Sequence, residues 1–299
     1  MIGFFIKLRT ALALGIVNLL RVTLYRLSLK FGIHPVQKLK ASVPQGPFFL
    51  VGNYQNCVLP CTQKWQDRAF YFGWFSVALH NSPPDWYLNP FTNKSIDTSN
   101  RPWWQIPDFG TEVGDIKAIW EASRFDWVLS FAQQAKLNDK TQLERLNAWL
   151  DDWCRKNPPY FGFNWKCGQE ASIRVMHLAM AALILEQTEN PTLGLKNVIK
   201  IHLQRIATTL SYAIAQDNNH GTSEAAALYI GGSWLELVGD NAGSGWHKLG
   251  RKWLENRVFH LIENDGSFSQ YSVNYHRMML DTMCMVELWR RHLNLSPFP

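Results

Sequence analysis

The chain has 299 residues, of which 46% are apolar and 18% charged, and its formal net charge is +6. This length can bury a large core and exceeds a single compact helical bundle, so we expect a multi-helix array or two domains. The basic balance favours an acidic partner, but the Lys and Arg residues are scattered rather than gathered in a run, which argues against nucleic acid.

Residues 1–32 predict one long amphipathic helix. Arg9, Arg21, Arg26 and Lys30 interrupt its apolar residues, so it lacks the uncharged stretch of about 18 residues that a spanning helix needs. It also lacks a small-x-small cleavage site, which argues against a cleavable signal peptide. We expect a helix that packs on the core or makes peripheral contact with a membrane surface.

Residues 47–111 differ in character from the rest of the chain. The aromatic stretches 47–55 and 69–79 predict short strands or irregular segments. Residues 81–111 are rich in Pro, Trp and Asn and predict a long irregular surface segment, whose aromatic content argues against disorder.

Beyond residue 115 the apolar spacing predicts helices in series, with Asp115 and Asp139 as possible N-caps. Consecutive helices on short loops pack antiparallel, and without a fixed sequence repeat they favour a toroid over a solenoid. The fold class is therefore mainly α, an incomplete α/α toroid over 112–299 with an N-terminal unit over 1–111. The predicted helices span 116–136, 141–156, 169–187, 195–216, 223–238, 246–264 and 271–294.

Three polar loops follow alternate helices, at 162–166, 217–223 and 264–272. Alternate loops of antiparallel helices lie at the same end, so we expect these three to form one site. The second loop carries Asn-Asn-His-Gly at 218–221, residues better suited to a polar ligand than to a core.

The cysteines and tryptophans each allow a structural interpretation. Cys57 and Cys61 are four residues apart, but no second Cys or His pair completes a zinc pattern, so we expect no metal and buried free thiols, including Cys154, Cys167 and Cys284. The 14 Trp residues can line a sugar site or fill a helical core.

Several short motifs occur in a fixed order along residues 100–290. They are Arg-Pro-Trp-Trp at 101–104, Trp-Glu-Ala-Ser-Arg at 120–124, Asn164-Trp165 followed by Glu170 and Arg174, Asn219-His220, and Asp-Gly-Ser-Phe at 265–268 followed by Gln270, Ser272, Tyr275 and His276.

This combination resembles the helical domain of the heparinase II/III family of polysaccharide lyases, which is related to the oligoalginate lyases. The resemblance implies an incomplete α/α toroid followed by a β-sandwich domain, with the site between them. The sandwich and the last toroid helices would then lie outside this chain. It also implies an acidic polysaccharide as partner, a periplasmic location, and no cofactor.

The resemblance assigns catalytic roles to Asn219, His220 and Tyr275. A lyase removes the C5 proton of a uronic acid and expels the group at C4, so donors must stabilise charge on the adjacent carboxylate. Asn219 and His220 suit that task, and Tyr275 suits proton transfer if nearby positive charge from Arg174, His220 or His276 stabilises its phenolate. The expected substrate-binding residues are Arg174, Asn164, Trp165, Asn218, Glu170, His276 and Trp104.

Structural roles remain open for some of these residues. Glu121 with Arg124, and Glu170 with Arg174, have the helical spacing of ion pairs. Tyr275 alone fits an amphipathic helix.

Two other functions remain open. A glycoside hydrolase would need two carboxyl groups across the scissile bond, which Glu224, Glu263 or Asp265 could supply. The chain could instead be a non-catalytic polysaccharide-binding protein of bacterial envelope biosynthesis. The products discriminate, because a lyase makes an unsaturated uronate that absorbs ultraviolet light and a hydrolase does not.

Overall fold

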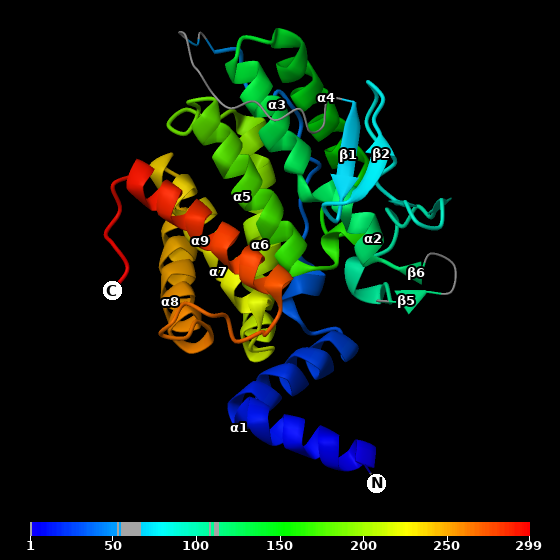
Figure 1. Ribbon diagram of the computed structural model, residues 1–299, viewed down its shortest axis with the longest axis vertical. Helices are drawn as coiled ribbons and strands as arrows, with labels where there is room; N and C mark the ends of the chain where they lie inside the picture. The colour runs from blue at the N-terminus through cyan, green and yellow to red at the C-terminus, as the bar shows by residue number, and fades with distance from the viewer. Residues whose placement is uncertain (1, 53, 55–66, 108, 111–113) are drawn as a thin grey trace.

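The computed structural model describes residues 2–52, 54, 67–107, 109–110 and 114–299, and over these it is mainly helical (Figure 1). The helices after residue 140 match the predicted ones closely. They are α4 (Lys140–Lys156), α5 (Gly168–Ile184), α6 (Leu193–Ala215), α7 (Asn219–Leu237), α8 (Gly243–Leu261) and α9 (Val273–His292).

The first helix, α1 (Ile2–Lys30), runs through a bend at Gly15, where φ is 75°. It projects from one end of the body in Figure 1, and its second half packs on α6. No helix in the described residues is long and apolar enough to cross a membrane.

The predicted helix 116–136 is interrupted. The chain forms α2 (Lys117–Trp120), a 3-10 turn η3 (Glu121–Arg124) and α3 (Asp126–Lys136), because Phe125 takes a left-handed conformation with φ 67°. Phe125 is fully buried, with its ring edge against Trp127 and Trp153. Packing of this ring therefore overrides the helical periodicity.

Residues 47–111 are largely irregular in their described part, as predicted. In the predicted surface segment 81–111 most of the described residues are exposed or half-buried, but Trp86, Tyr87 and Trp103 are buried. The stretch 69–79 folds into a hairpin rather than one strand, whereas residues 47–52 form none. Trp86 is fully buried and donates to Asp152 Oδ2 at 2.8 Å. The paired strands are β1 (Arg68–Tyr71) with β2 (Phe75–Ala78), β3 (Leu88–Asn89) with β4 (Lys94–Ser95), and β5 (Phe109–Gly110) with β6 (Gly114–Asp115).

One hydrophobic core joins this segment to the helices. Trp86 lies against the rings of Trp127 and Trp149, with centroid distances of 5.8 and 6.1 Å. Burial of such rings is a large stabilising contribution. The fully buried tryptophans are Trp86, Trp127, Trp149, Trp153, Trp165, Trp234 and Trp289.

Helices α7 and α8 approach each other closely through glycines. A Cβ on Gly232 would lie 2.3 Å from the backbone nitrogen of His247, and a Cβ on Gly250 would lie 2.2 Å from that of Tyr229. These contacts lie in the middle and second half of α7, and near its start a Cβ on Gly221 would lie 2.9 Å from Cδ of Arg257 in α8.

The thiol prediction is confirmed in part. Cys154 is buried, and burial raises the pKa of its thiol. Cys167 is half-buried and Cys284 is exposed, so the expectation was wrong for Cys284. Cys57 and Cys61 lie outside the described residues.

Candidate functional site

The starts of α5, α7 and α9 meet at a cavity of about 530 Å³. The predicted loops therefore converge on one end of the helices. The residues that line the cavity are Tyr25, Arg26, Leu29, Trp103, Trp104, Lys117, Trp120, Arg124, Lys166, Cys167, Gly168, Gln169, Glu170, Arg205, Thr209, Tyr212, Gln216, Asn219, His220, Glu224, Tyr275 and Met278.

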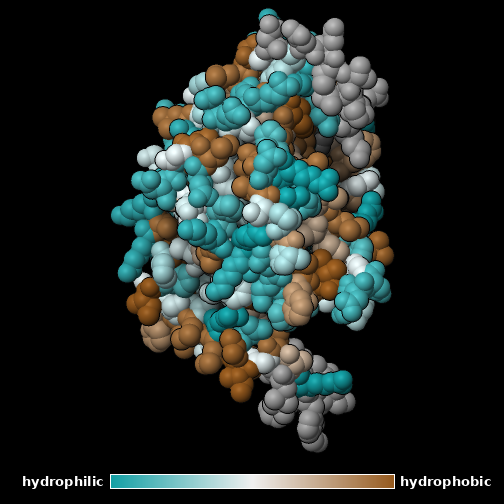
Figure 2. Space-filling view, turned by 90° about the vertical axis from the view of Figure 1, so that its left-hand side faces the viewer, coloured by the Kyte–Doolittle hydropathy of each residue, from teal (hydrophilic) through white to brown (hydrophobic). Residues whose placement is uncertain are grey.

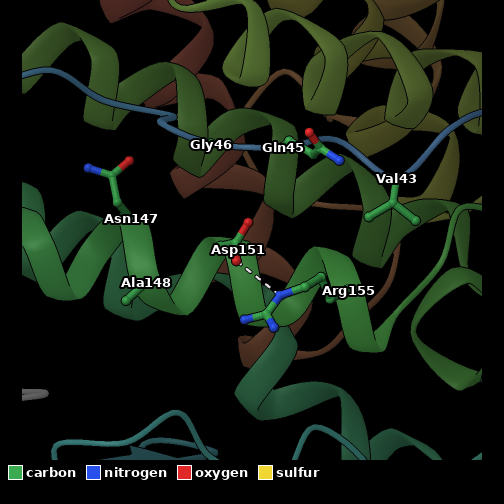
Figure 3. A pocket seen from close by; sticks show the side chains of 7 residues that line it. All are labelled: Val43, Gln45, Gly46, Asn147, Ala148, Asp151 and Arg155. Carbon is green, nitrogen blue, oxygen red and sulfur yellow. Dashed lines mark ion pairs between the residues drawn. The ribbon is translucent and has the colours of Figure 1, made fainter.

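Another hollow, of about 640 Å³, lies between residues 43–46 and α4 (Figure 3). Of the residues that line it, the two charged ones are Asp151 and Arg155, and they pair with each other at 2.9 Å. Because these charges are already paired, we take the first cavity as the candidate site. No group of three His, Cys, Asp or Glu side chains suited to a metal occurs in the described part of the chain.

The first turn of α7 places His220 on the cavity wall. Asn218 is the N-cap, and its Oδ1 accepts from the His220 backbone nitrogen at 3.0 Å. Asn218 does not line the cavity, so the structure gives it a capping role in place of the predicted substrate contact. The expected loop is also shorter, because Asn219 and His220 already belong to the helix.

His220 lies between Cys167, the N-cap residue of α5, and Glu224, one turn along α7. The imidazole Nδ1 is 3.8 Å from Glu224 Oε1. Burial disfavours the charged imidazole, but the neighbouring Cys167 and Glu224 side chains raise the pKa of His220 well above its ordinary value. This direction favours the charged imidazolium form of the ring.

Glu224 is a buried carboxylate of the cavity, with 3% of its surface exposed. Burial raises its pKa, whereas the neighbouring His220 ring acts in the opposite direction. Its Oε2 has no hydrogen-bond partner among the described residues. Glu224 can therefore stabilise the charged form of His220, while its Oε2 can still accept a hydrogen bond.

Asn219 connects the start of α7 to the start of α5, to α9 and to the loop before α9. Its backbone nitrogen donates to Gln270 Oε1 at 2.8 Å, and its side-chain amide donates to Gln169 Oε1 and, at 3.6 Å, to Met278 Sδ. Asn219 is 4% exposed and lines the cavity. These contacts show that it positions the walls of the cavity.

Tyr275 lies in the first turn of α9 and lines the same cavity, with 40% of its surface exposed. Its phenol is therefore accessible, and the structure brings it to the cavity that Asn219 and His220 share. His276 instead lines a separate hollow with Tyr271 and Arg277, so the predicted substrate contact by His276 is wrong for this cavity.

Glu170 and Trp104 both line the cavity. Both oxygens of Glu170 accept from Arg124, at 2.8 and 3.0 Å, and Arg124 also pairs with Glu121. The predicted Glu121–Arg124 ion pair is thus present, but Glu170 pairs with Arg124 rather than with Arg174. Glu170 fixes the wall and has little capacity left for a ligand.

The predicted contacts by Arg174, Asn164 and Trp165 are wrong, because all three are fully buried. Arg174 donates to His202 Nε2 at 2.9 Å and to the Asn164 carbonyl at 2.7 Å. Burial lowers the pKa of Arg174 to about 9, which still leaves it charged at neutral pH. The Trp165 ring packs on His202, with centroids 4.6 Å apart.

The sequence prediction missed Arg205 and Cys167. The Arg205 guanidinium lies 3.8 Å from the centre of the Trp103 ring and donates to the carbonyls of Trp165 and Lys166 at 3.0 and 2.7 Å. In the sequence Arg205 is one polar position of a helix. Its place at the cavity depends on the segment around Trp103, which no local pattern connects to α6.

Comparison of the chain with protein-family models, with curated proteins and with solved structures finds no match. The resemblance to the heparinase II/III lyases therefore rests on the sequence motifs alone.

Proposed function

We propose that this chain binds a uronate-containing polysaccharide in the cavity and cleaves it by β-elimination. The observation that carries the proposal is that His220 and Tyr275, from the first turns of α7 and α9, line one cavity together with Asn219. We further propose that α3 to α9 form an incomplete α/α toroid. The contacts of α5 with α6, α6 with α7 and α7 with α8 support it.

The charge of the cavity suits an acidic sugar. Its cationic side chains outnumber its carboxylates, and one of the two carboxylates, Glu170, is held by Arg124. Fixed positive charge in a cleft attracts anionic ligands. The cationic lining residues are Arg26, Lys117, Arg124, Lys166, Arg205 and His220, and the carboxylates are Glu170 and Glu224.

In the proposed reaction the C5 proton is abstracted, its electron pair forms the C4–C5 double bond, the C4–O bond breaks, and the leaving oxygen takes up a proton. The His220 imidazolium stabilises the charge that builds on the uronate carboxylate. The accessible Tyr275 side chain either accepts the C5 proton as a phenolate or donates a proton to the leaving oxygen as a phenol. Asn219 positions these groups through its contacts to Gln169 and Gln270.

The aromatic wall supplies a surface for a sugar ring. Trp104 is half-buried, and Trp103 stands at its edge with centroids 5.9 Å apart. Trp120 donates from its indole nitrogen to the Phe163 carbonyl at 2.9 Å, which fixes a third ring at the cavity.

The test is a panel of uronate-containing polysaccharides followed by ultraviolet absorbance. Wild-type protein should generate the unsaturated product from at least one of them, and Tyr275→Phe should not. Tyr271→Phe is the matched control, because Tyr271 is 94% exposed and lies outside the cavity. Equal turnover by wild type and Tyr275→Phe would remove Tyr275 from the reaction, and no absorbance with any uronate would overturn the lyase proposal.

A glycoside hydrolase is less well supported. Of Glu224, Glu263 and Asp265, the cavity includes Glu224 alone. The Asp265 Oδ1 accepts from the Ser267 backbone nitrogen at 2.9 Å, as expected of a turn residue. The same assay separates the functions, because new reducing ends without absorbance indicate hydrolysis and binding without turnover indicates a binding protein.

A further inference from the structure

The second half of α1 is apolar on two opposite faces. One face packs on the body, where the Tyr25 ring stacks on Tyr212 with centroids 4.1 Å apart and Leu29 packs against the core. Arg21 also lies on this face, with its guanidinium 5.3 Å from the centre of the Trp253 ring. A helix that only covered the body would need no second apolar face.

The opposite face carries large apolar side chains that are exposed. Ile16, Leu20, Leu24, Leu27 and Phe31 recur at intervals of three or four residues, so they form one stripe along the helix. Their exposed fractions are 78, 56, 65, 45 and 67%. Figure 2 shows apolar residues gathered at the end of the molecule where α1 lies. An exposed apolar surface of this kind usually marks an interaction site.

The charge next to the stripe is uniformly positive. No Asp or Glu precedes Asp67 in the sequence. The exposed cations Arg26, Lys30, Lys38 and Lys40 lie on the second half of the helix or just beyond it. A second copy of this surface would bring like charges together, which opposes self-association. An anionic lipid surface complements both the cations and the apolar stripe.

We propose that α1 lies in the interface of an anionic membrane, with the stripe from Ile16 to Phe31 inserted among the acyl chains and the cations on the headgroups. The same helix lines the cavity through Tyr25 and Arg26. Docking would therefore hold the cavity within about one helix diameter, roughly 10 Å, of the lipid surface. The inference is independent of the chemistry in the cavity.

The test is sedimentation of the full chain with vesicles. It should bind vesicles that contain phosphatidylglycerol, bind vesicles of phosphatidylcholine alone more weakly, and lose affinity as salt is raised. The variant Leu20→Glu/Leu24→Glu should bind the anionic vesicles at least about tenfold more weakly per substitution, because each removes inserted methylene groups.

The matched control is Leu193→Glu/Leu288→Glu, which adds the same charge at two leucines that are 69 and 59% exposed away from α1. It should bind as wild type does, and both variants should unfold at the wild-type denaturant concentration. The proposal is overturned if wild type does not bind anionic vesicles, or if both double variants weaken binding equally. It is also overturned if the α1 variant changes only the oligomeric state.

Discussion

Gly168→Ala tests whether Glu224 holds His220 as described. Gly168 is the first residue of α5 and lies directly against the Glu224 carboxylate. A Cβ at this position would be 2.4 Å from Oε1, 2.6 Å from Cδ and 2.7 Å from Oε2 of Glu224. These distances are shorter than van der Waals contact allows, so the carboxylate must leave its place beside the imidazole.

The expected cost follows from two opposing effects. Overpacking a close contact lowers the free energy of unfolding by about 1–3 kcal/mol. Replacing Gly by Ala in a helix raises it by up to about 1 kcal/mol. We expect Gly168→Ala to lower the free energy of unfolding by about 1–2 kcal/mol. Gly245→Ala is the matched control, because Gly245 also lies in the first turn of a helix and a Cβ there meets no atom within 4 Å.

The assay has two readouts. Denaturant unfolding measures stability, and nuclear magnetic resonance of the His220 ring follows its titration. With the carboxylate displaced, the pKa of His220 should fall in Gly168→Ala and stay at the wild-type value in Gly245→Ala. If the two variants show the same stability and the same His220 titration, the described contact between Glu224 and His220 is refuted.

Three further changes have defined outcomes. Arg174→Met leaves buried acceptors without a donor and should cost about 3 kcal/mol of stability in denaturant unfolding, whereas the exposed Arg155→Met should change it little. Glu224→Gln removes a group that raises the pKa of His220. The charged imidazolium contributes to the free energy of unfolding in full below about pH 6.5, and this contribution is lost as pH rises through the raised pKa of the folded state. In stability titrations Glu224→Gln should therefore lose the contribution at a lower pH than wild type does. Gly250→Ala forces a Cβ against backbone and should unfold at markedly lower denaturant than wild type; unchanged midpoints would contradict the close approach of α7 and α8.

The helices from residue 140 on could be predicted because their signals are local. Asp139 caps α4, and its Oδ1 accepts from the backbone nitrogen of Thr141 at 3.0 Å. Such caps and the apolar spacing act within one or two turns. The break at Phe125 has no local signal, because it depends on rings brought to it from α4.

The meeting of the loops could also be predicted, since alternate loops of antiparallel helices share one end. The order of helices placed Asn219 and Tyr275 at the same cavity without knowledge of any contact. Which residues face the cavity could not be predicted in the same way. Arg174 and Trp165 are polar and aromatic residue types suited to a sugar, yet the core uses them to satisfy each other and His202.

Cys167 and Arg205 line the cavity, although nothing in the local sequence predicts it. Cys167 precedes α5 and Arg205 lies within α6, and each shares the cavity with residues distant in sequence. The half-buried thiol of Cys167 becomes informative only once the fold places it at the same cavity as His220. Seven of the tryptophans are fully buried in the core, whereas Trp103, Trp104 and Trp120 line the cavity.

The most direct measurement is calorimetric titration of the protein with an oligouronate and with the neutral oligosaccharide made by reducing its carboxylates. The account predicts binding of the oligouronate, affinity for the neutral sugar that is at least about tenfold weaker, and a comparable loss of oligouronate affinity in His220→Ala. Equal affinity for the two sugars, or oligouronate binding unaffected by His220→Ala, would contradict it.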